Sequence, residues 1–494
     1  MMVGRHSRPF QALVGAAALI LPVAPTFAQE IAPLDEPIEE ALTTGSLLPG
    51  DVLRSSALTF PRILESFERE AAARADQLAA DGAFDLMLEA EAYDRITGTF
   101  SGGFAEVGAR QPLAPLGAEI YGSYRVSDGS FPIYENIYNT NQLGEFKVGG
   151  LLSLLRDSTI DPRRYEIEDT RLAADQARLD ILLVRLNVQF EALRAYWRWV
   201  AAGNEIRVYE QLLEIAEGRA IGLERQVRAG ASPRIALTEN EQNVIRRRTL
   251  LAEARRNFAT ASNSLGFYLR SGDGTLITPT RDQLPDPELL GGLPRVDVLL
   301  AMQQNRILAA RPELRSIALT IDRARNNVAL QRNELQPRLD LKAEVSRDFG
   351  PVGDGGSTFD STDTTVGVVF TVPLQNREAR GALRRAEAEL REAQLREDRV
   401  ADELAVELGN ILANLTAALE LADLAENEVT QADAMVAAER RRFSLGAGDF
   451  FLVNLREERA ADAQIRRIRA DLNGRLATAS YNAATMNLDE LGLE

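Results

Sequence analysis

The residue types that carry most enzyme chemistry are nearly absent from this chain. The sequence has no cysteine and one histidine, His6. His6 lies in an N-terminal segment that we expect to be removed, so the mature chain would contain neither residue. This excludes disulfides, Ser-His-Asp and Cys-His catalysis, and nearly every zinc site. Carboxylate chemistry of the glycosidase kind stays open as the enzyme alternative. We predict no enzyme activity, no cofactor and no metal.

The charge of the chain argues against a nucleic-acid partner. There are 56 Lys and Arg residues against 73 Asp and Glu residues, a net charge of −17. A protein that binds nucleic acid shows a basic patch or stripe instead.

The N-terminus is typical of a secretory signal peptide over residues 1–28. Arg5 and Arg8 provide the positive charge, an apolar run follows from Ala12 to Leu21, and Thr26-Phe27-Ala28 fits the cleavage pattern. The apolar run is too short to span a bilayer, and no later stretch approaches eighteen uninterrupted apolar residues. With no cysteine after the signal, lipid attachment is excluded. If the exported chain crosses a membrane, it does so with strands.

The elements that would position any site are long helices. Residues 376–443 contain no proline, and their apolar residues recur at steps of three, four and seven, the period of one helical face. A helix of that length would reach roughly 100 Å. No ordinary globular core is that deep, so we expect the helix to lie along an elongated structure.

The remaining chain divides into an arm, two similar halves and a linker. We predict an extended segment over 29–57, a first half over 58–270, a proline-rich linker over 271–294 and a second half over 295–494. Each half has a helix, a β-hairpin, a long helix, a glycine turn and another helix. The predicted segments are a helix at 61–96, hairpins near 117–155 and 337–373, and turns at 229–233 and 444–449.

The two halves align without a gap when one is shifted by 216 residues. Glu241 then falls on Glu457, Gly230 on Gly446 and Asn257 on Asn473. Identities between alanine-rich helices are weak by themselves, but the matched order of elements indicates a duplication.

Four predicted strands cannot close a barrel within one chain. In a soluble protein they would form a small sheet under the helices. In an exported protein they could instead combine with strands of other subunits, because runs such as 117–127 and 337–347 have the nine to eleven residues that a membrane strand needs.

At this point the sequence resembles the TolC-like outer-membrane efflux proteins over nearly its whole mature length. The resemblance is carried by the duplicated halves, the RPEL segment at 311–314, the junction VPLQNREARGALRRAEAEL and the segment RRRFSLGAGDFFLVNLREERAADAQ. It implies a mainly α protein with a small β part. Three subunits with four strands each would share one membrane barrel of twelve strands, and their helices would form a hollow periplasmic tube.

The resemblance also implies the partners and the sites. An inner-membrane pump and a periplasmic adaptor would deliver substrates, and the glycine turns would contact the adaptor. The predicted contact residues are those of the two turns: Arg228, Gly230, Ala231, Ser232, Pro233, Leu445, Gly446, Ala447, Gly448 and Asp449.

Two further sites are predicted less directly. Family members often carry an acidic ring past the second turn, but the aligned positions here are Leu452 and Leu455, so Asp449 is the candidate gate carboxylate. Its alternative role is to cap the last helix. The arginine run 440–442 could pair with acids on a neighbouring helix and hold the entrance shut, with Arg441 and Arg442 as the candidate gate residues. The alternative is a solvated face in the last helical turn, which suits the helix dipole.

Tyr121 and Tyr124 are candidates for an aromatic girdle at the membrane surface. We therefore predict a passive outer-membrane exit duct for efflux. A type I protein secretion channel and a soluble periplasmic coiled-coil scaffold are the two alternatives.

Overall fold

The computed structural model describes residues 45–231, 233–272, 274–294, 311–353 and 361–493, and these belong to one compact unit. The predicted signal peptide, most of the predicted arm, Ser232 and the start of the helix expected after residue 295 lie outside the described residues.

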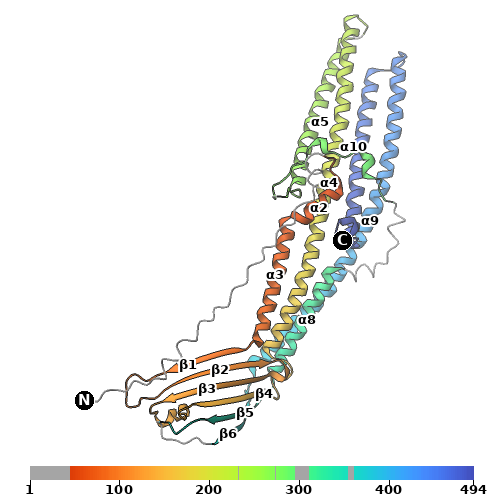
Figure 1. Cartoon of the computed structure of the whole chain (residues 1–494). Coiled ribbons are helices and arrows are strands. Elements are labelled where there is room, and N and C mark those ends of the chain that lie inside the picture. Colours follow the sequence, from red (N-terminus) through yellow and green to blue (C-terminus); the bar gives the residue numbers. More distant parts are fainter. Residues whose placement is uncertain (1–44, 232, 273, 295–310, 354–360, 494) are drawn as a thin grey trace, which may run out of the picture. The chain divides into compact units, whose positions relative to one another are not determined.

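Long helices make up most of the described chain (Figure 1). In the first half they are α2 (Pro49–Thr59), α3 (Pro61–Asp81), α4 (Pro162–Arg228) and α5 (Arg234–Gly266). In the second half they are α8 (Pro312–Asn333), α9 (Arg377–Ser444) and α10 (Phe450–Ala484). Helices α4 and α9 have 67 and 68 residues, and α5 and α10 have 33 and 35, as the shift of 216 residues implies.

Two of the expected element boundaries are wrong. The segment expected to be extended through residue 57 contains helix α2, in which Pro49 takes the first helical position and Asp51 accepts a hydrogen bond from the Leu48 N–H at 3.0 Å. The helix expected over 61–96 ends at Asp81, and a strand occupies Met87–Tyr93.

A six-stranded antiparallel sheet, rather than four strands, lies at one end of the helices (Figure 1). Its strands follow the order of the chain: β1 (Met87–Tyr93), β2 (Gly103–Leu113), β3 (Ala118–Asp128), β4 (Glu145–Ser153), β5 (Arg338–Asp348) and β6 (Thr362–Thr371). Strand β2 pairs with β3 along its whole length, from Gly103 opposite Asp128 to Leu113 opposite Ala118.

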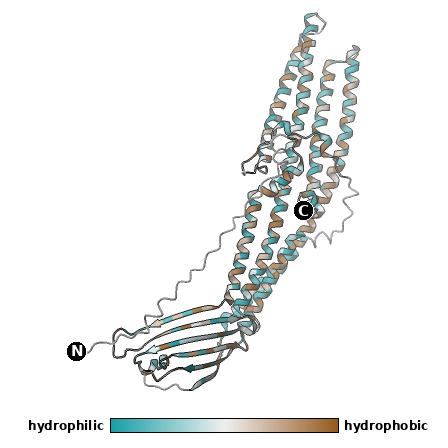
Figure 2. Cartoon of the chain, viewed as in Figure 1, coloured by the Kyte–Doolittle hydropathy of each residue, from teal (hydrophilic) through white to brown (hydrophobic). Residues whose placement is uncertain are grey.

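The register gives the sheet one apolar and one polar face. On the apolar face, Ala90 lies opposite Val107, Val107 opposite Tyr124 and Tyr124 opposite Phe146. This face continues across β5 and β6, where Leu341 lies opposite Val368. Most of its large side chains are exposed in the single chain; Leu88 and Val366, for example, are 75% and 67% exposed. Figure 2 shows the resulting alternation of polar and apolar residues.

The helices pack through narrow apolar contacts. The largest buried side chains, Trp199 and Tyr196 of α4, form a cluster with Leu265, Leu47 and Leu284, so these aromatic residues pack between elements. On α9 the buried positions include Ala386, Ala393 and Leu404.

In the part of the chain that the structure describes, α9 is also the one helix long and apolar enough by composition to cross a membrane. One such helix is weak evidence of a membrane span, and Leu415 and Leu419 of α9 pack against Tyr481 of α10.

Candidate functional site

Both long helices end in the same kind of turn. Gly230 and Gly446 follow α4 and α9 and have φ angles of 70° and 74°. The N–H of the next residue donates to a carbonyl five residues earlier, from Ala231 to Gln226 at 2.8 Å and from Ala447 to Arg442 at 3.0 Å. This is the Schellman C-cap, whose left-handed residue is usually glycine.

The two turns lie at the ends of the helices away from the sheet (Figure 1), and their residues are open to solvent. Arg228, Ala231 and Pro233 are exposed, and Leu445 is 77% exposed. A Cβ added at Gly230 or Gly446 would meet no atom within 4 Å. The turns are therefore available for contact with another molecule, and adaptor contact stays a prediction.

The start of α10 fixes the end of the second turn. The Asp449 carboxylate accepts a hydrogen bond from the Phe451 N–H at 3.1 Å and caps the helix. A Cβ at Gly448 would lie 2.8 Å from the Phe443 nitrogen. Gly448 is thus needed for the close approach of two backbones, and Asp449 has a capping role whether or not it also serves as a gate.

The arginine run 440–442 divides into different roles. Arg442 donates to Glu439 at 3.3 Å and to the Ala447 carbonyl at 3.5 Å, so both contacts stay within its own turn. Arg441 is exposed. Arg440, the first residue of the run, reaches an acid on the neighbouring helix, Glu457 of α10, at 2.9 Å. The gate role of Arg441 and Arg442 stays a prediction.

Glu457 is a charged centre that the sequence reasoning missed. Its side chain is 2% exposed. It accepts hydrogen bonds from Arg219 of α4 and Arg440 of α9, and it lies 3.7 Å from Arg247 of α5. Arg219 also donates to Asn454. Four helices therefore meet at one carboxylate, which joins the α4–α5 hairpin to the α9–α10 hairpin.

This centre holds more positive than negative charge. Burial lowers the pKa of the Arg247 guanidinium, while the charge of Glu457 opposes that shift. Because arginine stays protonated in proteins, three cations face one anion. In the sequence, the alignment of the halves pairs Glu457 with Glu241 and does not distinguish the two glutamates. The structure does so, because Glu241 is exposed whereas Glu457 is buried where four helices pack together.

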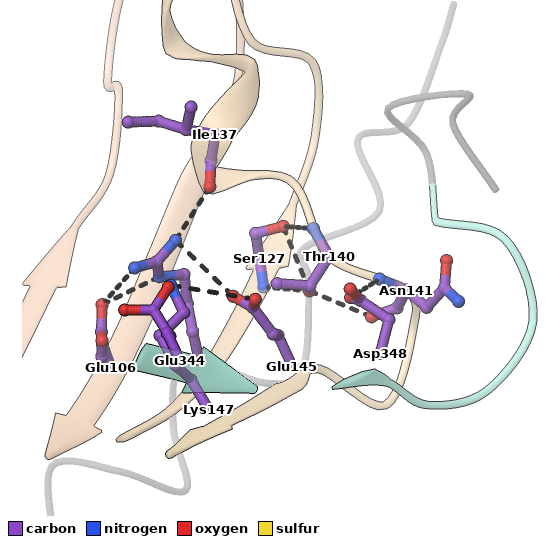
Figure 3. A network of polar contacts seen from close by, with 10 residues as sticks. Glu106, Ser127, Ile137, Thr140, Asn141, Glu145, Lys147, Glu344 and Asp348 are labelled. Atoms are coloured by element: carbon purple, nitrogen blue, oxygen red, sulfur yellow. Dashed lines mark hydrogen bonds and ion pairs between the residues drawn. The ribbon is translucent and has the colours of Figure 1, made fainter. Parts of the chain in front are cut away.

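A second polar network lies on the polar face of the sheet (Figure 3). Arg125 of β3 pairs with Glu106 of β2 at 2.8 Å and lies 3.9 Å from Glu145 of β4. Lys147 lies 3.9 Å from Glu145 and 3.8 Å from Glu344 of β5. Carboxylates and cations thus alternate across four neighbouring strands.

The segment between β3 and β4 folds back over this polar face. Arg125 donates to the Ile137 carbonyl at 2.9 Å, and the Thr140 N–H donates to the Ser127 hydroxyl at 2.7 Å. The Tyr138 ring stacks on Phe104 at 4.6 Å between centroids. Phe104 and Arg125 both point to the polar face, so the segment that includes the 3₁₀ helix η4 (Ile133–Tyr138) covers that face at the end of the strands away from the helices.

The prediction that Tyr121 and Tyr124 share one aromatic girdle is wrong. Residues separated by an odd number of positions in a strand point to opposite faces. Tyr121 lies on the polar face, where its hydroxyl donates to Glu344 at 2.7 Å. Tyr124 lies on the apolar face, opposite Phe146, and remains the girdle candidate.

Within the described ranges, no three Asp, Glu or His side chains are grouped to hold a metal ion.

Comparison with known proteins gives a family match for the second half of the chain. Residues 304–485 match the model of the outer membrane efflux protein family. A search of the curated proteins finds no match.

Solved structures match over nearly the whole chain. The outer membrane protein VceC of Vibrio cholerae is 14% identical, with a TM-score of 0.62 over 88% of this chain and 95% of that one. The CmeC outer membrane channel of Campylobacter jejuni is 15% identical, with a TM-score of 0.61 over 95% and 93%. The MtrE outer membrane channel of Neisseria gonorrhoeae is 14% identical, with a TM-score of 0.59 over 94% and 95%.

Proposed function

We propose that this chain, a TolC-like outer-membrane efflux protein by its family match and its fold, is the exit duct of a tripartite efflux system. Three copies would form a channel whose sheets lie in the outer membrane and whose helices extend into the periplasm. Substrates would pass from an inner-membrane pump and a periplasmic adaptor to the outside. The channel is passive, so the energy comes from the pump.

One observation carries this proposal: the sheet has a continuous exposed apolar face backed by a charged polar face. A soluble protein does not leave such a face in water. A membrane strand, in contrast, needs apolar side chains toward lipid and polar side chains toward a lumen. The soluble periplasmic scaffold is therefore the weaker alternative.

The helices support the second part of the proposal. Helices α4 and α9, with 67 and 68 residues, are each roughly 100 Å long. They place the turns at Gly230 and Gly446 far from the sheet (Figure 1). In an outer-membrane channel these turns would reach the middle of the periplasm, where an adaptor is accessible.

The test is fractionation followed by channel recording. We expect the mature chain in the outer membrane, as a trimer that requires detergent and conducts ions in planar bilayers. A monodisperse soluble monomer would contradict the proposal.

Efflux and type I protein secretion require a separate experiment. Deleting the gene and measuring drug sensitivity beside the secreted proteome distinguishes the two. Increased sensitivity with an unchanged secretome supports efflux, and the reverse result supports secretion.

A further inference from the structure

The number of strands in the sheet determines how copies of the chain fit together. Six strands pair in sequence order, and among the described residues no strand pairs with the outer edge of β1 or of β6. An unpaired strand edge cannot remain inside a bilayer, because its N–H and C=O groups would lack hydrogen-bond partners. Both edges must therefore be covered.

We infer that the outer edge of β1 pairs with the outer edge of β6 of the next copy, so that three subunits close a barrel of eighteen strands. This rests on the proposed trimeric channel and deepens it. The partner at each edge is a second copy of this chain, and the strands β1 and β2 belong to the barrel wall.

The first argument is that β3 has no free edge. A barrel of twelve strands would use β3 to β6 only, and β3 would pair with β6 of the next copy. In the structure β3 pairs with β4 on one side and with β2, over eleven residue pairs, on the other. That ladder would have to be broken, and Arg125 on β3 would lose Glu106 on β2.

The second argument is that β1 and β2 have the same two faces as the other strands. Leu88, Ala90 and Ala92 of β1 continue the apolar face, while Glu89 and Glu91 lie on the polar face. On β2, Ala105 and Val107 are apolar and Glu106 is polar. An accessory hairpin outside the membrane would have no reason to keep this alternation.

The third argument is direction. Each strand runs antiparallel to its neighbour, and the number of strands per chain is even. Strand β6 therefore runs opposite to β1, so a β1–β6 contact between copies continues the antiparallel order around the ring. With strands about 4.8 Å apart and tilted by about 40°, the barrel radius rises from roughly 12 Å for twelve strands to roughly 18 Å for eighteen.

Because the chain contains no cysteine, introduced cysteine pairs can test this contact. In the first panel, Ala90→Cys on β1 is combined in turn with Thr364→Cys, Val366→Cys, Val368→Cys and Phe370→Cys, which cover successive positions on the same face of β6. In the second panel, Ile120→Cys on β3 is combined with the same four positions. The pair Ala105→Cys and Val126→Cys, which are opposite each other in the β2–β3 ladder, is the control within one chain.

After mild oxidation of the channel in native outer membranes, we expect covalent dimers and trimers from at least one pair of the first panel. We expect none from the second panel, and a disulfide within the monomer from the control. Cross-links from the second panel alone, or none from either panel in an intact trimer, would overturn the eighteen-stranded barrel and leave the trimeric channel standing. Loss of the trimer in the unmodified chain would overturn the proposed function instead.

Spin labels at residues 88–92 provide a second measurement, which can be interpreted without knowing the register of the β1–β6 contact between copies. We expect accessibility to oxygen, which concentrates in lipid, to be highest at the even positions, and accessibility to a water-soluble nickel complex to be highest at the odd ones. Labels that all show water accessibility would place β1 outside the membrane wall and overturn the inference.

Discussion

At the scale of single residues, Gly446 is the position where a small change should have the clearest effect. Its φ angle of 74° is one that side chains with a Cβ rarely adopt. We expect Gly446→Val to destabilise the α9–α10 turn by about 1–2 kcal/mol and to weaken efflux without reducing the amount of trimer. Drug susceptibility beside an outer-membrane immunoblot measures both.

The matched control for this prediction is Gly409→Ala. Gly409 lies inside α9, has no neighbour within 4 Å of an added Cβ, and is not among the positive-φ glycines. Alanine there should be neutral or stabilising by about 1 kcal/mol. Equal loss of efflux in both variants would contradict the assignment of the turn.

Glu457 is the second residue with a specific expectation. Glu457→Gln would leave Arg219, Arg247 and Arg440 without their shared carboxylate. We expect the free energy of unfolding to fall by about 2 kcal/mol, less than the roughly 3–5 kcal/mol that breaking a fully buried pair costs, because Arg440 is half exposed. We also expect higher single-channel conductance, because the centre joins the two hairpins near the turns.

Glu241→Gln is the control, because it makes the same change at the aligned but exposed position of the first half. It should alter stability by less than about 0.5 kcal/mol. Thermal unfolding of the trimer and bilayer recordings compare the two. A Glu457→Gln channel that matches Glu241→Gln in both would show that the centre has no role at the entrance.

At the scale of elements, the linker between the halves is held to α4 by charge. Arg281 donates to both carboxylate oxygens of Glu210, at 2.8 and 2.6 Å. These hydrogen bonds lower the pKa of Glu210. A lowered pKa in the folded state means that the contribution to stability is present above the ordinary pKa and is lost as the pH falls through the folded value.

We therefore expect acid pH to loosen this attachment, seen as faster proteolysis within residues 274–294. Glu210→Gln should show that faster cleavage at neutral pH and no further pH dependence. Cleavage that is slow at every pH in both proteins would contradict the role of the pair.

The segment between β3 and β4 is likewise held in place by an arginine, Arg125. Arg125→Ala would remove the contacts with Glu106 and with the Ile137 carbonyl. We expect the segment to detach and the open-channel current to increase and become noisier. Arg110→Ala, on the same face and paired with Glu119 at 3.3 Å, should leave the current unchanged.

The elements that could be predicted from the sequence are those whose apolar residues follow a helical period or those with a counterpart in the other half of the chain. The helix at 376–443 shows its period, and the two glycine turns support each other through the alignment of the halves. Strand β1 was missed because Leu86, Met87, Leu88 and the alternating Glu and Ala residues that follow are strong helix formers. Strand β2 was missed because it lies within residues 97–116, whose glycines and prolines favour a loop. The alternation at 88–92 was visible, but only pairing with Val107 and its neighbours makes those residues a strand. Glu457 was missed because three of its partners come from other helices.

At the scale of the whole molecule, the sheet faces should determine whether the chain inserts into a membrane. Val368 and Val369 are neighbours on β6, 62% and 54% exposed, and point to opposite faces. We expect Val368→Arg, on the apolar face, to cost about 2–4 kcal/mol at the bilayer centre and to reduce the heat-resistant trimer in the outer membrane. Val369→Arg, on the polar face, should be tolerated. A soluble scaffold would tolerate both changes equally.

The β1–β2 hairpin also bears on how such a channel can change over evolution. The two ends of a hairpin lie at the same end of the sheet. Gaining or losing the hairpin therefore changes the number of strands by two and leaves every following element in place. Strands β3 to β6 keep their order and direction, helices α4 to α10 keep their positions, and the turns at Gly230 and Gly446 do not move. The diameter of the barrel and the length of the helices can therefore change independently during evolution. Selection for a larger substrate can widen the barrel without altering the helices.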